Sequence, residues 1–477
     1  MTEHDDLHDD LRDDDHPHEE CGVFGVIAPG RDVSRLTFYA LHALQHRGQE
    51  SAGIAVRDGE NIMIQRDLGL VSAVFDETSL RSLTGDAAIG HVRYSTTGAN
   101  KWDNSQPVAH TRGDDIVALG HNGNLTNTGQ LRQEMERTGA ALKASTDSEI
   151  ITAMLAHEGG TLLEAIERVM PRLIGAYSIV TLSGDELVAF RDPHGVRPLV
   201  LGRLDEDGWC VASETCALDQ IGAEYVRDVR PGEAVRIGAT GVESHQVMPS
   251  LGPRRCVFEH IYFARPDSVM EGQTVWESRH RMGVELAREA PAEADLVVGL
   301  PDSGTPAAIG YAQESGIPYA EAVVRNRYVG RSFIQPDQAM RQVGIRLKFN
   351  PLPAVIRGKR LVVVDDSIVR GNTTRKVIEM LLGAAEVHMR TSSPPVKWPC
   401  FYGIDMADRA ELVAAQHSVD EIAALTGADS LAYLSLDGLQ RAVGRPAGEY
   451  CRACLTGEYP IRVPDSAQKL RFEHVAA

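Results

Sequence analysis

The chain has 477 residues, of which 43% are hydrophobic and 24% charged, a composition typical of globular proteins with roughly two to four domains. Its net charge of −19 argues against binding to nucleic acid, and no apolar run approaches the ~18 residues of a membrane helix. Seven cysteines are too sparse for a secreted disulfide scaffold. We therefore expect a cytoplasmic protein whose cysteines are catalytic or bind metal.

Residues 1–20 form an acidic head. They contain ten Asp or Glu, one Arg and four His, and so carry −9 of the net charge. Because this segment has almost no apolar content, we expect a disordered, solvated tail rather than a histidine metal site. The composition changes abruptly at Cys21, where an apolar run begins. The change indicates a propeptide whose removal leaves Cys21 as the N-terminus.

The segment 21–250 reads as an α+β layered domain, with no dinucleotide-binding fingerprint. Its predicted elements are a strand from residue 21, a helix over 34–46, a strand after residue 50, a strand over 89–93, a strand before residue 121, a helix opening at 145–149 and further strands over 178–214. Ser145 or Thr146 is the expected cap of the helix at 145–149, with Glu149 at the capping-box position.

Five motifs occur in order over about 130 residues: CGVFGV, HRGQESAGIA, HVRYSTTG, HNGNL and STDSE. Together they resemble the class II glutamine amidotransferase domain, which has the N-terminal nucleophile fold. The resemblance implies a layered αββα architecture and the release of ammonia from glutamine.

The chemistry explains why the cysteine must come first. A free α-amino group, with a pKa of ~7.7–8.0, can accept the proton of a thiol with a pKa of ~8.5, whereas an internal amide nitrogen cannot. The resemblance implies that Cys21 is the nucleophile and that Asn122 and the Gly123 N–H form the oxyanion hole. It further implies that Arg93 binds the α-carboxylate of glutamine and Asp147 its α-ammonium. A surface ion pair or helix cap is the alternative for these last two.

The second half, 251–477, begins near Gly252 and Pro253. We expect a helix over 274–290 and a buried strand over 294–300, followed by PDSG and a helix over 305–315. A basic, aromatic, glycine-containing stretch runs from residue 325 to 348.

The most informative stretch of this half is LVVVDDSIVRGNTT, residues 361–374. A buried strand is followed by two carboxylates, a loop rich in hydroxyls and glycine, and a helical pattern over 375–382. Ligands bind at the carboxyl ends of strands in open α/β sheets, and helix N-termini hold phosphate. Adjacent carboxylates suit sugar hydroxyls or hydrated Mg²⁺. The alternative is an ordinary strand that runs into a capped helix.

This stretch resembles the 5-phosphoribosyl-1-pyrophosphate (PRPP) loop of type I phosphoribosyltransferases, which have a mostly parallel α/β sheet. The resemblance implies Mg²⁺ at Ser303, Asp365 and Asp366, and a closing loop at 325–348, for which a plain surface loop is the alternative. The PRPP-binding residues it implies are Asp365, Asp366, Ser367, Ile368, Val369, Arg370, Gly371, Asn372, Thr373 and Thr374. The family often has Thr where this chain has Asn372.

Four cysteines remain in this half: Cys256, Cys400, Cys451 and Cys454. Such a set can hold Zn²⁺ or a [4Fe–4S] cluster, or can be buried thiols, and the spacing does not choose. Cys210 and Cys216 lie in strand-like apolar surroundings and are expected in the core.

Residues 21–477 as a whole resemble the glutamine–PRPP amidotransferase family, in which one branch pairs a cleaved propeptide with four cysteines on a [4Fe–4S] cluster. The family converts glutamine, PRPP and water to 5-phosphoribosylamine, pyrophosphate and glutamate, the opening step of purine synthesis, and passes ammonia internally. It also implies feedback inhibition by purine nucleotides and a homotetramer. The alternatives are a PRPP-sensing regulatory protein without catalysis and a glutaminase-coupled sugar-phosphate aminotransferase. The intact glutaminase motifs disfavour the first, and residues 361–374 disfavour the second.

Overall fold

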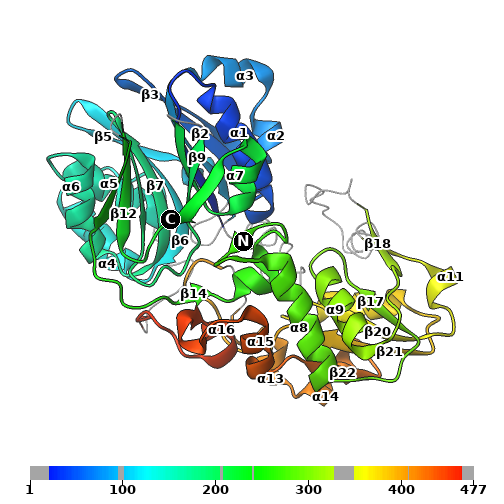
Figure 1. Ribbon diagram of the computed structural model, residues 1–477. Helices are drawn as coiled ribbons and strands as arrows, with labels where there is room; N and C mark the ends of the chain where they lie inside the picture. The colour runs from blue at the N-terminus through cyan, green and yellow to red at the C-terminus, as the bar shows by residue number, and fades with distance from the viewer. Residues whose placement is uncertain are drawn as a thin grey trace, which may run out of the picture.

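The computed structural model describes residues 21–94, 101–204, 208–238, 241–326, 349–404, 406 and 408–464. The expected propeptide, 1–20, and most of the expected closing loop, 327–348, lie outside the described residues. The chain forms two halves, seen in blue to green and in green to red in Figure 1. No helix in the described ranges is long and apolar enough to cross a membrane.

Two antiparallel sheets form the centre of the N-terminal half. The seven-stranded sheet has the order β11 (Glu224–Asp228), β9 (Val200–Leu204), β10 (Gly208–Ala212), β1 (Gly22–Ile27), β4 (Ala87–Arg93), β2 (Ser51–Asp58), β3 (Asn61–Leu68). The six-stranded sheet has the order β13 (Gly241–Gln246), β12 (Glu233–Gly238), β8 (Glu186–Arg191), β7 (Gly175–Ser183), β6 (Asp115–Leu125), β5 (Val108–Arg112).

Helices cover the outer face of each sheet (Figure 1). Along β1, Val23 and Ile27 pack between the sheets, whereas Phe24 and Val26 face the helices, as the two-residue period of a strand requires. Helices α1 (Val33–Ala43), α2 (Val71–Val74), α3 (Glu77–Ser82) and α7 (Thr215–Ile221) lie on one side, and α4 (Thr128–Arg137), α5 (Asp147–His157) and α6 (Leu162–Val169) on the other. These layers confirm the predicted αββα glutaminase fold.

The C-terminal half is built on a parallel sheet in the order β17 (Leu296–Gly299), β20 (Arg360–Asp365), β21 (Glu386–Thr391), β22 (Ser430–Tyr433). Val362 and Val364 pack on one face and Leu361 and Val363 on the other. Burial on both faces explains the unbroken apolar run in the sequence and confirms the predicted α/β fold.

Helices also pack on both faces of this sheet. One face carries α8 (Val275–Glu289), α9 (Thr305–Ser315), α15 (Leu436–Val443) and α16 (Ala453–Thr456), and the other α11 (Pro353–Ile356), α12 (Asn372–Met380), α13 (Val413–Gln416) and α14 (Val419–Thr426). Short pairs complete the half: β14 (Arg255–Cys256) with β23 (Tyr450–Cys451), β15 (Val269–Met270) with β16 (Gln273–Thr274), and β18 (Val323–Arg325) with β19 (Phe349–Pro351). A π-helical turn, η5, spans Glu259–Phe263.

Two local predictions were wrong. The helix expected over 34–46 ends at Ala43, and a separate turn, η2 (Gln45–Arg47), follows it. Gly48, which follows this turn, packs against the backbone of β4: a Cβ there would lie 2.6 Å from the Arg93 carbonyl carbon. Cys216 is buried as expected, but it lies in α7 rather than in a strand.

The linker between the halves is packed onto the N-terminal half. After β13, the backbone N–H groups of Leu251, Arg254 and Cys256 donate to the carbonyls of residues 193, 194 and 196 at 3.0, 2.8 and 3.1 Å. These three hydrogen bonds fix the start of the C-terminal half on the loop that precedes β9. The domain boundary at residues 250 and 251 stays a prediction.

Candidate functional site

The expected nucleophile stands at the start of β1. Cys21 is buried, and its Sγ lies 3.5 Å from the carbonyl oxygen of Tyr94. The pKa of the thiol is raised to about 11, chiefly by burial; the contact with the Tyr94 carbonyl and the charge of Arg93 lower it, and the charges of Glu50 and Asp147 raise it. These groups are therefore close enough for their charges to act on the thiol. Near neutral pH the thiol is protonated and needs a base before it can attack.

Asn122 and Gly123 lie side by side in β6, opposite β7. The side chain of Asn122 is fully buried, and neither its Oδ1 nor its Nδ2 has a hydrogen-bond partner among the described residues. A buried amide without partners costs roughly 1–3 kcal/mol, which a bound ligand can recover. Gly123 has a φ of 144°, and a Cβ there would lie 2.0 Å from the Ala176 carbonyl oxygen. Only glycine fits, and the pair suits an oxyanion hole.

Arg93 points from the first sheet toward the second. On the same strand, His91 reaches across with its Nε2 3.0 Å from the carbonyl oxygen of His121. Side chains two residues apart share a face, so Arg93 faces β6 as well. Its guanidinium is buried, 3.7 Å from a carboxylate oxygen of Glu50. Burial lowers the pKa of His91 to about 3, so Arg93 carries the positive charge at this place.

Asp147 is the first residue of α5, whose N-cap is Thr146 as expected. Its carboxylate accepts from the backbone N–H of Leu125 at 3.0 Å and of Ser148 at 2.9 Å, and lies 3.4 Å from Nδ1 of His121. Burial alone would raise the pKa of Asp147, but His121 and the N–H donors hold it below its usual value. A carboxylate has about four acceptor positions, so this buried anion can also bind an ammonium group.

Sequence reasoning missed a segment of the C-terminal half, residues 401–403, that packs against β6, the strand that carries Asn122 and Gly123. The side-chain amide of Asn124 donates to the carbonyl of Phe401 at 2.9 Å, and Arg197 donates twice to the carbonyl of Tyr402 at 2.8 and 2.6 Å. A Cβ at Gly403 would lie 2.8 Å from the carbonyl carbon of Gly123. No signal in the sequence links residues this far apart.

A second missed residue, Arg47, belongs to the HRGQESAGIA motif, but nothing in that motif identifies its partners. The guanidinium of Arg47 donates to the carbonyl of Cys21 at 3.1 Å.

The second candidate site lies at the carboxyl ends of β17 and β20. Oδ2 of Asp366 accepts a hydrogen bond from Ser303 Oγ, and Oδ1 accepts one from Ser367 Oγ at 2.7 Å. Asp365 accepts from the N–H of Asp366 at 2.9 Å, and both carboxylates are buried. Gly304 allows the two loops to meet, because a Cβ there would lie 2.6 Å from the carbonyl oxygen of residue 364. The structure thus brings together all three residues expected at Mg²⁺.

The loop after Asp366 leads directly into α12. Gly371, with a φ of 86°, is the N-cap, and the helix begins at Asn372, three residues before the expected start. Ile368 and Val369 are buried in the hydrophobic clusters on opposite faces of the sheet, so only their backbone can reach a ligand. Arg370 forms an ion pair with residue 411 at 2.9 Å. Thr373 and Thr374 lie in the first turn of α12, where N–H groups point out of the helix.

The four remaining cysteines gather between the halves. Cys256 and Cys451 are opposite each other in the parallel pair β14 and β23, and charges on Cys400 and Cys451 both act on the pKa of Cys454. Burial raises the pKa of Cys451 to about 12 and that of Cys256 and Cys454 well above its usual value. Within the described ranges, no three His, Cys, Asp or Glu side chains are placed to hold a single metal ion. Four cysteines gathered in this way can bind either Zn²⁺ or a [4Fe–4S] cluster as thiolates.

Comparison with known proteins agrees with both sites. Residues 91–220 match the family model described as glutamine amidotransferase domain, and residues 280–391 match the phosphoribosyl transferase domain. The amidophosphoribosyltransferase of Mycobacterium tuberculosis is 54% identical over 478 residues, with 97% of this chain and 90% of the relative covered. The chain belongs to the amidophosphoribosyltransferase family. It is an enzyme, a pentosyltransferase of the first step of purine biosynthesis.

Further members of the amidophosphoribosyltransferase family agree in sequence and in fold. The Synechococcus elongatus enzyme is 51% identical, covering 97% of this chain and 96% of the relative. A solved structure of glutamine PRPP amidotransferase from B. subtilis, complexed with ADP and GMP, superposes with a TM-score of 0.89 at 43% identity, covering 94% of this chain and 99% of that one. The two-domain fold is therefore that of amidophosphoribosyltransferases.

Proposed function

We propose that this chain combines glutamine, PRPP and water into 5-phosphoribosylamine, pyrophosphate and glutamate through two sites that share one ammonia molecule. The observation that carries the proposal is the side-chain amide of Asn122, buried and without a partner among the described residues. A fold retains such a group at a cost, and an oxyanion that forms during hydrolysis of a carboxamide would satisfy it.

In the first half-reaction, the thiolate of Cys21 attacks the side-chain carbonyl carbon of glutamine. Asn122 Nδ2 and the Gly123 N–H donate to the oxygen, which becomes negative. Ammonia leaves and a thioester to Cys21 remains, which water hydrolyses to glutamate and the free thiol. Arg93 binds the α-carboxylate, because its planar fork matches a carboxylate, and Asp147 binds the α-ammonium.

The base for this step is the α-amino group of Cys21 itself, freed by cleavage between Glu20 and Cys21. Burial keeps the thiol of Cys21 protonated near neutral pH, and an amide nitrogen is too weak a base to accept its proton. An α-amine with a pKa of ~7.7–8.0 can take its proton. Removal of the acidic propeptide would therefore switch on hydrolysis of glutamine.

In the second half-reaction, ammonia attacks C1 of the ribose of PRPP, pyrophosphate leaves, and the new amine loses a proton. Asp365 and Asp366 bind the ribose hydroxyls, and with Ser303 they would hold Mg²⁺, which would neutralise charge on the pyrophosphate. The hydrogen bonds from Ser303 and Ser367 orient Asp366 in advance. Residues 367–374 hold the 5′-phosphate through hydroxyls and backbone N–H groups at the start of α12.

Internal transfer of ammonia keeps it from water, where it would be protonated and lose its lone pair. Two contacts support it. The segment 401–403 of the C-terminal half packs against β6, next to Gly123. Arg325, at the start of the stretch 325–348, forms an ion pair with Asp302 beside Ser303 at 2.6 Å. The closing loop expected over 325–348 would begin at this point, cover PRPP and exclude water.

The gathered cysteines would hold a [4Fe–4S] cluster as thiolates, which fixes the C-terminal residues against β14. With a cleaved propeptide, such a cluster would put the chain in the cluster-containing branch of its family. Purine nucleotides would act as inhibitors, an inference that the ADP and GMP complex of the B. subtilis protein supports. We further infer a homotetramer in the cytoplasm.

Cys21→Ser tests this function. The variant should lose glutamine-dependent product formation and keep product formation from high ammonia with PRPP. Loss of both activities would contradict the division between two sites. Wild-type glutaminase activity should rise with PRPP. A PRPP sensor would show no glutaminase activity, and a sugar-phosphate aminotransferase would show activity indifferent to PRPP.

A further inference from the structure

A buried ionic network joins the start of β1 to the C-terminal half. Its centre is Arg47, whose Nε donates to the carbonyl of Cys21 at 3.1 Å. One guanidinium nitrogen lies 2.5 Å from Glu214 and 3.0 Å from Glu259, and the other lies 2.8 Å from Glu259. All three side chains are at most 1% exposed. Burial alone would lower the pKa of Arg47, but the two carboxylates raise it well above its usual value, so the guanidinium is always charged.

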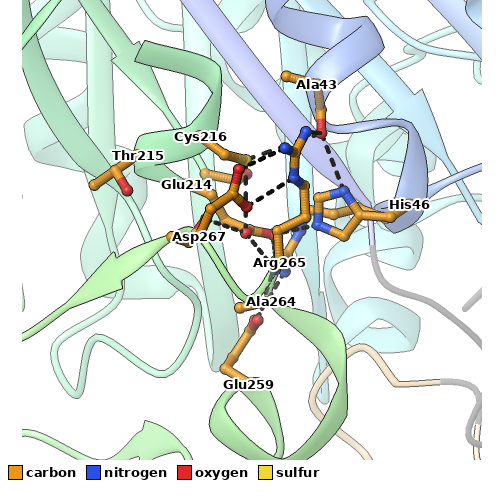
Figure 2. A network of polar contacts seen from close by, with 12 residues as sticks. Ala43, His46, Glu214, Thr215, Cys216, Glu259, Ala264, Arg265 and Asp267 are labelled. Carbon is orange, nitrogen blue, oxygen red and sulfur yellow. Dashed lines mark hydrogen bonds and ion pairs between the residues drawn. The ribbon is translucent and has the colours of Figure 1, made fainter. Parts of the chain in front are cut away.

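Glu214 contacts residues of both halves (Figure 2). Besides Arg47, it accepts from Nε2 of His46 at 2.7 Å, from the backbone N–H of Arg265 at 2.9 Å and from Oγ of Ser268 at 2.6 Å. Its oxygens therefore have several partners in both halves. Since these contacts already tie Glu214 to the interface, its contribution is to hold the halves together.

Glu259 differs, because both of its oxygens accept hydrogen bonds from Arg47, while Oε1 also lies 3.9 Å from a guanidinium nitrogen of Arg197. It is the first residue of η5, three residues after Cys256. The turn is held in place by Arg279, whose guanidinium donates to the carbonyls of His260 at 2.9 Å and Ala264 at 2.8 Å. A carboxylate presented from a fixed turn, with two parallel hydrogen bonds to a guanidinium, sets the orientation of that guanidinium.

The orientation of the Arg47 guanidinium matters because it binds the backbone carbonyl of Cys21. A residue at a chain start has no preceding residue to anchor it, and Gly22, the next residue, has no side chain. Gly22 pairs with Val92 of β4, and the hydrogen bond from Arg47 to the carbonyl of Cys21 adds a polar contact on the backbone of the nucleophile itself. A nucleophile misplaced by about 1 Å can react about 100-fold more slowly.

We propose that Glu259 is a positioning residue for the hydrolysis of glutamine. It aligns Arg47, and Arg47 places the backbone of Cys21 so that Sγ stands in line with the bound carboxamide. The inference rests on the proposed role of Cys21. It makes the C-terminal half responsible for part of the geometry of the glutaminase site.

Glu259→Gln tests the proposal, because it keeps the volume of the side chain and replaces one acceptor by a donor that Arg47 cannot use. We expect kcat with glutamine to fall about 10- to 100-fold, with KM for glutamine within about twofold, since neither Arg93 nor Asp147 is touched. The rate with ammonia and PRPP should remain that of wild type. Glu285→Gln is the matched control, because Glu285 pairs with arginines of α8 and α15 within the C-terminal half.

Chemical modification of Cys21 distinguishes a misplaced thiol from a less reactive one. A diazoketone analogue of glutamine should alkylate Cys21 at least about tenfold more slowly in Glu259→Gln, because it must react from the bound position. Iodoacetamide, which needs no bound position, should alkylate Cys21 at nearly the wild-type rate. Mass spectrometry of the peptide that contains Cys21 measures both.

Wild-type kcat with glutamine, or equal losses with glutamine and with ammonia, would overturn the proposal. If Glu259→Gln does not fold, Glu259→Asp keeps the charge but withdraws it by one methylene, and a smaller loss confined to glutamine is then expected. If Cys21→Ser still hydrolyses glutamine, the proposed function itself has failed. If Cys21→Ser is inactive and Glu259→Gln is not impaired, only the positioning role is wrong.

Discussion

Replacement of Gly403 by alanine tests how the C-terminal half shapes the oxyanion hole. Gly403 has a φ of 104°, and a Cβ there would lie 2.8 Å from the carbonyl carbon, 2.9 Å from the Cα and 3.1 Å from the carbonyl oxygen of Gly123. All three atoms belong to the backbone, so no flexible side chain can move aside. To reach an ordinary contact of 3.4 Å, the two segments must separate by about 0.6 Å.

A shift of this size would displace the Gly123 N–H from the developing oxyanion. Loss of one oxyanion donor costs ~10²–10³ in turnover, and a misplacement of about 1 Å costs about 10². We therefore expect glutamine-dependent turnover of Gly403→Ala to fall about 10- to 100-fold. The ammonia-dependent rate should stay near that of wild type, because Asp365 and Asp366 lie at the other site.

The assay compares product formation from glutamine and from ammonia in the same preparation. Gly316→Ala is the control: Gly316 also has a positive φ, 73°, at the end of α9, but a Cβ there meets nothing within 4 Å. It should lose about 1 kcal/mol of stability from backbone strain and keep the wild-type ratio of the two rates. An unchanged ratio in Gly403→Ala would refute the coupling between Gly403 and Gly123.

Three further predictions address the other sites. Asp366→Asn should slow product formation from glutamine and ammonia alike, because Asp366 is at the PRPP site, and a normal ammonia-dependent rate would contradict its assignment. Anaerobically purified protein should contain about four irons per chain, with iron lost in Cys451→Ser, whereas stoichiometric zinc would point to a structural metal site. Although burial alone would raise the pKa of Glu214, His46 and Arg47 hold it below its ordinary value of 4.5. The unfolded chain therefore takes up this proton first as the pH falls, so the stabilisation is complete above about pH 4.5 and is lost below it. The urea midpoint should fall less from about pH 7 to about pH 4 in Glu214→Gln than in wild type, and equal falls would refute this role.

Sequence patterns predicted best where the local chain determines the outcome. Helix α9 spans 305–315 as expected, and α8 starts one residue after its Thr274 cap and ends one before the predicted end. The apolar run 361–364 predicted a buried parallel strand, because a strand with apolar side chains on both faces must be covered on both faces. The family resemblance implied that the carboxylates after it share a site with Ser303, and the parallel strands β17 and β20 end at the same edge.

Contacts that form only when the two halves pack together could not be predicted from the sequence. Nothing around Gly403 indicates that its carbon packs against Gly123, and nothing in the HRGQESAGIA motif shows that Arg47 pairs with Glu259. The inward direction of Ile368 and Val369 also follows from packing on opposite faces of the sheet rather than from the loop sequence. Such contacts are fixed only when distant elements pack together.

The N-terminal residue of the active protein shows directly whether a freed Cys21 is the nucleophile that hydrolyses glutamine. Intact-mass and N-terminal analysis of purified enzyme, together with glutaminase assays of cleaved and uncleaved fractions, would identify the catalytic form. We predict that activity with glutamine belongs to chains that begin at Cys21. Full glutaminase activity in chains that retain residues 1–20 would contradict it.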